Sequence, residues 1–156
     1  MAARYAIRQA RPDEQTALFD LWHASVQATH SFLSEDALAE IAIEVKDKFL
    51  PNVVPDVIVD VGDDKPLGFL AMSGDSIDAL FVDAKCQGQG LGTLLMDAAK
   101  AGKNSLTVEV NEQNPKAWTF YHRCGFVDID RKPVDDAGRP FPLIVLRWTR
   151  PDPSSE

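Results

Sequence analysis

With 156 residues, of which 45% are hydrophobic and 26% charged, the chain has the composition of one globular domain, predicted over residues 1–150 with a disordered tail at 151–156. The net charge of −8 and the lack of a basic run exclude a protein that tracks a nucleic-acid backbone, and no apolar run is long enough to cross a membrane. The N-terminus has no apolar signal core, and Cys86 and Cys124 fit no metal-ligand spacing, which predicts free thiols in a cytoplasmic protein without a metal site.

The first third of the chain predicts a strand and two amphipathic helices. Residues 4–9 have the pattern of a strand. Asp13 is expected to cap a helix that runs to the neighbourhood of Ala28, because apolar residues then recur at helical spacing. Ser34 is expected to cap a second helix, which Pro51 ends.

The middle of the chain predicts three consecutive strands, and the first two form a hairpin around a turn rich in turn-forming residues. These strands occupy residues 57–61, 67–72 and 76–82. A glycine-rich stretch then leads into a helix that ends near Ala101, and a later helix begins at Asn114 and ends at Gly125. Further strands are predicted at residues 106–110, 126–131 and 141–148. The order β-α-α-β-β-β-α-β-α-β-β indicates an α/β (α+β) fold with a mixed sheet.

Three glycines at alternate positions, Gly88, Gly90 and Gly92, carry the chain from a strand into a helix. Such a turn directs several backbone N–H groups and the positive end of the helix dipole to one place, which suits a phosphate or pyrophosphate. The spacing excludes a Walker loop, which needs Gly-Lys-Ser/Thr, and a dinucleotide fingerprint, which needs G-x-G-x-x-G. An ordinary tight turn from strand to helix is the alternative interpretation.

Two motifs in the sequence resemble the GCN5-related N-acetyltransferase family. The first has the form Gln-x-x-Gly-x-Gly, at Gln87, Gly90 and Gly92, and is similar to the coenzyme A pyrophosphate loop of that family. The second resembles a helix that carries a tyrosine and ends in Gly-Phe; its members are Asn114, Ala117, Phe120, Tyr121, Gly125 and Phe126. The resemblance covers essentially the whole chain and implies a mixed, mostly antiparallel central sheet with helices on both faces. Shorter stretches at residues 28–33, 78–82, 111–114 and 135–143 resemble the bacterial YjaB-like acetyltransferases.

The resemblance implies acetyl-CoA (coenzyme A) as the cofactor. Its pyrophosphate is expected on the backbone of residues 87–92, the glycine stretch. The resemblance also implies that the pantetheine arm pairs with the backbones of Leu80 and Val82, one of which donates to the oxyanion, and contacts Asn114. Tyr121 is implied as the general acid for the departing thiolate, and a core tyrosine with a satisfied hydroxyl is the alternative. The expected cofactor-binding residues are Leu80, Val82, Gln87, Gly88, Gln89, Gly90, Leu91, Gly92, Thr93, Asn114 and Tyr121.

Three residues are candidates for the base that takes a proton from the acceptor amine. Glu109 lies on the strand that follows the glycine-led helix, and a solvated strand charge is its alternative interpretation. Asp78 is the second candidate. His30 is the third, because the loop between the first two helices lines the acceptor site in this family, although a lone histidine in a loop is more often a surface residue. His23 and His122 are expected on helix surfaces.

The sequence therefore predicts an enzyme that moves an acetyl group from acetyl-CoA to a primary amine by direct attack in a ternary complex, with Tyr121, Glu109 and His30 as catalytic residues. The alternative is a non-catalytic acyl-CoA-binding or sensing module on the same fold. The expected partner is an amine substrate, either a small molecule or a protein, with no nucleic acid and no membrane, and the chain is expected to be a monomer or homodimer. The amine is expected to approach near His30 and Phe32.

Overall fold

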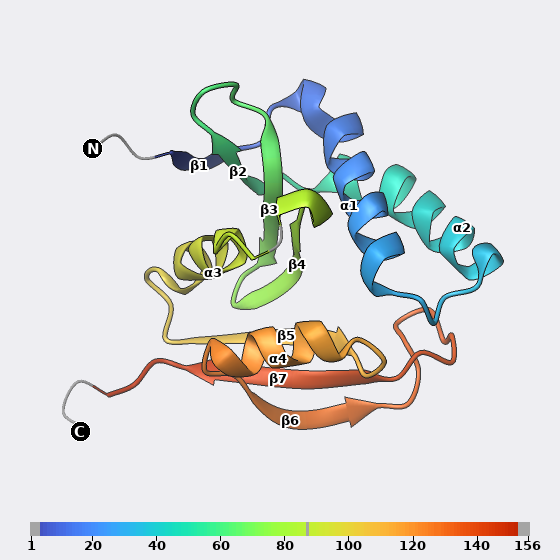
Figure 1. Cartoon of the computed structure of the whole chain (residues 1–156). Helices are drawn as coiled ribbons and strands as arrows, with labels where there is room; N and C mark the ends of the chain where they lie inside the picture. The colour runs from blue at the N-terminus through green and yellow to red at the C-terminus, as the bar shows by residue number, and fades with distance from the viewer. Residues whose placement is uncertain (1–3, 87, 153–156) are drawn as a thin grey trace. The chain divides into compact units, whose positions relative to one another are not determined.

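The computed structural model describes residues 4–86 and 88–152, and Figure 1 traces them along the chain. These residues form two compact units. The first unit takes the described residues up to Ala71 together with residues 79–95, and the second takes residues 72–78 and the described residues from Met96 onward.

The helices and strands from the N-terminal side to the glycine stretch follow the predicted order. β1 is Tyr5–Gln9, a 3-10 turn is Pro12–Glu14, and α1 is Gln15–Thr29. α2 is Glu35–Glu44 and continues through a π turn, Val45–Phe49, and a 3-10 turn, Leu50–Asn52. β2 is Asp56–Asp60, β3 is Pro66–Ser73, β4 is Ser76–Val82, a 3-10 turn is Ala84–Cys86, and α3 is Leu91–Lys100.

The core of the first unit forms where α1 packs on one face of β2 and β3. Trp22 of α1 and Val57 of β2 belong to one buried apolar cluster, which α2 borders with partly buried side chains. On the other face of the strands, Gly68 permits close packing, because a Cβ there would lie 2.8 Å from the Phe81 carbonyl oxygen and 3.3 Å from Leu95 of α3. β2 and β3 contain continuous runs of buried residues, which explains why short apolar runs in the sequence predicted these strands well.

The predicted helix caps are confirmed with one exception. Ser34 Oγ accepts a hydrogen bond from the Ala37 N–H at 3.1 Å, as expected for the cap of α2. The prediction for Asp13 is wrong, because this residue lies inside the 3-10 turn and the N-cap of α1 is Glu14. The Glu14 side chain does not cap the helix, since it is bound by Arg8 instead.

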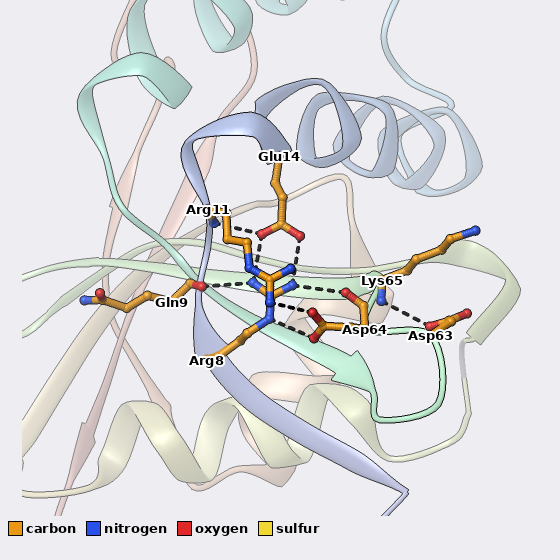
Figure 2. A network of polar contacts seen from close by, with 7 residues as sticks. All are labelled: Arg8, Gln9, Arg11, Glu14, Asp63, Asp64 and Lys65. Atoms are coloured by element: carbon orange, nitrogen blue, oxygen red, sulfur yellow. Dashed lines mark hydrogen bonds and ion pairs between the residues drawn. The ribbon is translucent and has the colours of Figure 1, made fainter.

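Figure 2 shows the polar network that ties the end of β1 to this 3-10 turn and to the β2–β3 turn. The Arg8 guanidinium donates to both carboxylate oxygens of Glu14, at 2.8 Å each, and its Nε donates to Asp64 Oδ1 at 3.0 Å. Arg11 reaches the other Asp64 oxygen at 2.6 Å. The Arg8 and Glu14 side chains are only 22% and 12% exposed, and the hydrogen bond from Arg8 holds the pKa of Glu14 below its ordinary value.

The second unit is built on three paired strands and one helix. β5 is Ser105–Asn111, α4 is Pro115–Arg123, β6 is Val127–Lys132 and β7 is Leu143–Thr149. β7 pairs antiparallel with β5 along the whole of β5 and with β6 on its other side. Along β5 the apolar residues Leu106, Val108 and Val110 are buried while Glu109 is exposed, so the predicted alternation is confirmed.

β6 lies at the end of the strand order and is exposed along nearly all of its length. Val127 is 58% exposed and Ile129 is 45% exposed. In the ladder with β7, Asp128 faces Leu146 and Asp130 faces the preceding residue of β7, so Ile129 forms a bulge. This edge therefore combines apolar and charged side chains on an irregular strand.

Among the described residues the strand order is β1-β2-β3-β4-β5-β7-β6, with β4 and β5 parallel and the β1–β2, β2–β3, β5–β7 and β6–β7 pairs antiparallel. The predicted element order and the mixed, mostly antiparallel sheet are confirmed. β7 begins at Leu143 rather than Phe141, because Pro142 has no N–H to donate to a ladder. The single domain predicted for residues 1–150 remains a prediction, as does the tail, of which residues 153–156 lie outside the described part.

Candidate active site

The glycine stretch of the first unit has the backbone conformation that only glycine adopts readily. Gly88 has φ 83° and Gly90 has φ 80°. A Cβ at either position would meet nothing within 4 Å, so these glycines are required by backbone conformation and not by crowding within the chain. Gln87, the first residue of the predicted motif, lies outside the described residues.

The start of α3 leaves backbone donors available. The first helical hydrogen bond into this end runs from the Leu94 N–H to the Gly90 carbonyl at 3.1 Å. Within the described part of the chain no acceptor takes the N–H of Gly92 or Thr93, as is general for the first turn of a helix. Exposed glycines, free donors and a helix dipole together form a site that suits an anion such as a pyrophosphate.

The side chains of the glycine stretch differ in burial and in the contacts they make. Leu91 is 1% exposed and anchors the helix in the core, whereas Thr93 is exposed. Gln89 accepts a hydrogen bond from the Tyr5 hydroxyl of β1, at 2.9 Å between the two oxygens. Sequence reasoning missed Tyr5, because 84 residues separate it from Gln89 and no local pattern connects them.

β4 leads directly to the glycine stretch and carries the two residues predicted to hold the pantetheine arm. Leu80 is half-buried and Val82 is buried. The Val82 carbonyl accepts a hydrogen bond from Ser25 Oγ of α1 at 3.2 Å, a contact that the sequence did not indicate. β4 pairs with β5 at Ser76 and Ile77, and the recorded ladder does not continue to the later residues of β4.

His30 lies at the C-terminal end of α1, in the first unit. Its backbone N–H donates to the Val26 carbonyl at 2.8 Å, and its ring centroid lies 5.3 Å from that of Phe32. The residue is half-buried, and burial lowers the pKa of its imidazole from 6.5. A neutral imidazole at pH 7 can accept a proton, which suits the base role predicted for it.

In the second unit, α4 is fixed at both ends. Asn114 accepts a hydrogen bond from the Ala117 N–H at 3.3 Å, which confirms the predicted cap, and Pro115 opens the helix. At the other end Gly125 has φ 95°, its N–H donates to the His122 carbonyl, and the Phe126 N–H donates to the Tyr121 carbonyl at 3.0 Å. This is the Schellman arrangement, which explains the Gly-Phe pair after the helix.

Tyr121 is held in the apolar interior of the second unit. It is 6% exposed, and its ring packs edge-on against Phe126 at 5.3 Å between centroids. Within the described residues no hydrogen bond to its hydroxyl is recorded, although the side chain as a whole is buried. Burial raises the pKa of this hydroxyl above its ordinary value, so it keeps its proton at neutral pH.

The two carboxylates that the sequence offered as bases both have partners. Glu109 Oε1 lies 2.6 Å from Lys132 Nζ of β6 in an exposed ion pair. Asp78 accepts a short hydrogen bond from Ser73 Oγ, and both lie at the β3–β4 turn. These contacts do not test the base role of either carboxylate, but they give each one a structural role as an alternative.

The remaining histidines and the cysteines do not form a further centre. His23 and His122 lie half-exposed on α1 and α4, and His122 Nε2 lies 2.8 Å from an Asp128 oxygen. Within residues 4–86 and 88–152 there is no cluster of three His, Cys, Asp or Glu side chains that could hold a metal ion. None of the helices in that part of the chain combines the length and apolar character that a bilayer crossing requires.

Comparisons with known proteins identify the family of this arrangement. Residues 21–142 match the family model for the acetyltransferase (GNAT) domain. The chain is 42% identical over 140 residues to the peptidyl-lysine N-acetyltransferase YjaB of Salmonella typhimurium, which covers 90% of this chain and 95% of that protein. The solution structure of apo-form YjaB from Escherichia coli matches with a TM-score of 0.86 and 40% identity, over 92% of this chain and 97% of that chain.

A more distant structure shows the same fold with coenzyme A bound. The PaiA N-acetyltransferase of Thermoplasma acidophilum in complex with coenzyme A matches with a TM-score of 0.75 and 18% identity, over 94% of this chain and 99% of that chain. The resemblance noted in the sequence is confirmed by the family model and by the close relatives. The chain belongs to the GNAT family and is an N-acetyltransferase that takes its acetyl group from acetyl-CoA.

Proposed function

We propose that the acceptor is the side-chain amine of a lysine in a peptide or protein. The proposal is supported by the 42% identity, over 90% of this chain, to an enzyme named for acetylation of peptidyl lysine. The net charge of −8 favours the approach of a cation such as lysine. Free thiols at Cys86 and Cys124 suit a reducing compartment, so we place the reaction in the cytoplasm.

In this proposal the backbone of the glycine stretch grips the pyrophosphate of acetyl-CoA. The support is the positive φ of Gly88 and Gly90 and the N–H groups at the start of α3. The backbones of Leu80 and Val82 orient the pantetheine arm and donate to the developing oxyanion. Bound acetyl-CoA supplies the thioester carbon that the amine attacks.

Tyr121 acts as the general acid in the proposed reaction. Its side chain is buried, no hydrogen bond to its hydroxyl is recorded within the described residues, and its raised pKa means that the hydroxyl carries its proton when the thioester is attacked. The departing thiolate is a base, and the hydroxyl gives it a hydrogen bond or a proton. Asn114 keeps its capping role and contacts the pantetheine arm.

We assign the base to His30, with Glu109 as the second candidate. Burial lowers the pKa of His30, so its imidazole is neutral at neutral pH and can accept the proton that the amine nitrogen loses as it attacks the thioester. Glu109 is already paired with Lys132, and a proton on its carboxylate would weaken that ion pair.

The acceptor is tested by measuring thiol release from acetyl-CoA with different nucleophiles. A peptide with one lysine and a blocked N-terminus is expected to react faster than the same peptide with arginine at that position and a free N-terminus. A polyamine and a hydroxyl compound complete the set. Faster turnover with any of these three would contradict the lysine proposal while leaving the acetyltransferase activity in place.

The base is tested by the pH dependence of kcat/KM. His30→Gln is expected to lower kcat/KM about 100-fold. It should also remove the acidic limb of the profile, whose midpoint is expected below 6.5. Glu109→Gln is the matched control, and it should cost less than about tenfold, as for loss of an exposed ion pair. The reverse pattern would assign the base to Glu109.

A further inference from the structure

The start of β1 makes a direct contact with the glycine stretch. The Tyr5 hydroxyl donates to Gln89 Oε1, with 2.9 Å between the oxygens. Gln89 lies between the two glycines with positive φ, so this bond acts on the part of the stretch with the greatest backbone freedom. A fixed Gln89 limits the conformations that Gly88 and Gly90 can reach before a ligand arrives.

β1 is a rigid support for this contact. It pairs with β2 at all five of its positions, from Tyr5 opposite Asp60 to Gln9 opposite Asp56. At its far end the Arg8 network holds the strand against the β2–β3 turn, as Figure 2 shows. A side chain placed on such a strand is held more precisely than one on a loop.

Arg4 brings a positive charge next to Tyr5. Its guanidinium carbon lies 5.2 Å from the centre of the Tyr5 ring, and its Nε donates to Asp60 at 3.3 Å. Among the described residues no acceptor binds its two terminal nitrogens, and its side chain is 71% exposed. An arginine with both terminal nitrogens available presents the fork that binds phosphate oxygens.

The charge of Arg4 also acts on the residue before the glycine stretch. Burial raises the pKa of the Cys86 thiol and Asp83 adds to this, while Arg4 and Lys85 lower it. Arg4 therefore acts through space on a residue that precedes the glycines. The chain is strongly acidic, and a local cation therefore has a specific use next to an anion site.

We propose that Arg4 and Tyr5 form part of the coenzyme A site: Tyr5 positions the glycine stretch through Gln89, and the Arg4 fork binds a phosphate group of the cofactor. This inference rests on the proposed role of the glycine stretch. It adds residues from the opposite end of the first unit's sequence, which neither motif contains.

The Tyr5 contact is tested by calorimetry with acetyl-CoA. Tyr5→Phe and Gln89→Ala are each expected to raise Kd about fivefold, as for loss of one hydrogen bond. The double variant should lose no more than either single variant, because both remove the same bond. Losses that add, with the protein still folded by circular dichroism, would overturn the positioning role of Tyr5.

The Arg4 contact is tested by removing the charge of Arg4 and by measuring the affinity for ligands with and without phosphate groups. Arg4→Gln is expected to raise the Kd of acetyl-CoA about three- to tenfold at low salt and to flatten its salt dependence. Arg147→Gln removes the same charge from an exposed position on β7 and serves as the control. Acetyl-pantetheine, which lacks all phosphates, should bind wild type and Arg4→Gln equally.

Coenzyme A without its 3′-phosphate separates the two possible phosphate sources. An Arg4→Gln effect that persists with this ligand assigns Arg4 to the pyrophosphate, and one that disappears assigns it to the 3′-phosphate. Equal acetyl-CoA affinity of wild type and Arg4→Gln would overturn the Arg4 role. Failure of wild type itself to bind acetyl-CoA would instead contradict the proposed role of the glycine stretch, so the two failures are distinguishable.

Discussion

The glycine stretch of the first unit and α4 of the second unit differ in the kind of group that performs their proposed functions. The glycine stretch offers backbone N–H groups, and its key positions, Gly88 and Gly90, have no side chain at all. α4 offers one side chain, the Tyr121 hydroxyl, whose placement depends on aromatic packing and on caps at both helix ends. Substitutions that alter backbone conformation should therefore impair the glycine stretch, whereas removal of the hydroxyl oxygen of Tyr121 alone should impair the proposed role of α4.

This contrast predicts two different kinetic signatures. A backbone site that grips the cofactor should act on affinity, since it makes the same contacts before and during the reaction. An acid that meets the thiolate only as it departs should act on turnover. Variants of the two regions can confirm or break this separation.

The largest effect is expected from removal of the Tyr121 hydroxyl. Tyr121→Phe should lower kcat by about 10²- to 10⁴-fold, the usual range for general acid catalysis, with little change in acetyl-CoA affinity. Stopped-flow measurement of thiol release with a lysine peptide checks this and shows whether chemistry limits the rate.

The second tyrosine of the chain provides a sharp contrast to this variant. Tyr5→Phe makes the same chemical change in the first unit and should act on Kd instead, through Gln89. If both variants lowered kcat to the same extent, the proposed separation between cofactor binding and general acid catalysis would be contradicted. Unchanged kcat in Tyr121→Phe would remove the acid role.

A smaller effect is expected from a side chain in the glycine stretch. Gly90→Val places a branched residue at φ 80°, where the strain is about 1–3 kcal/mol, so acetyl-CoA affinity should fall about 5- to 150-fold. Titration calorimetry measures the affinity, and circular dichroism checks that the protein is folded.

Gly74 provides the matched control for backbone strain. It has φ 58° in the β3–β4 turn, and a Cβ there meets nothing within 4 Å, as at Gly90. Gly74→Val should lower the melting temperature by a similar amount but leave acetyl-CoA affinity unchanged. An equal loss of affinity in both variants would show that strain acts through global stability and not through the anion site.

The smallest effect is expected from the hydrogen bonds between Arg8 and Glu14 at the end of β1. Glu14→Gln should lower the free energy of unfolding by about 1–3 kcal/mol at pH 7, because it breaks a charged hydrogen bond with Arg8. The folded pKa of Glu14 lies below 4.5, so this stabilisation is present above pH 4.5 and is lost as pH falls through the folded value.

Urea unfolding at pH 7 and at low pH measures this difference. The gap between wild type and Glu14→Gln should close as the pH falls, while Asp20→Asn, at an exposed position on α1, should show no such gap. A gap independent of pH would mean that packing, and not ionisation, explains the role of Glu14.

Local signals in the sequence made most of the fold predictable, and with it the placement of several candidate site residues. Apolar runs and alternation predicted the strands, Ser34 and Asn114 predicted the caps, and the alternate glycines predicted the tight turn before α3, because each depends on neighbours within a few residues. The prediction that Asp13 caps the helix failed because a 3-10 turn over Pro12–Glu14 precedes α1 and includes this residue. The Tyr5–Gln89 and Glu109–Lys132 contacts could not be predicted, since each joins residues that are far apart in the sequence and no sequence period records such a contact.

The exposed edge of β6 has a consequence for how the protein behaves at high concentration. A flat apolar edge strand would template another chain, because its outer N–H and C=O groups are free to pair. Here the bulge at Ile129 interrupts the ladder and acidic residues flank it on both sides, which disfavours the addition of a second strand in continuous register. The exposed side chains of Val127 and Ile129 therefore lie on an edge that is a poor template for fibrous growth.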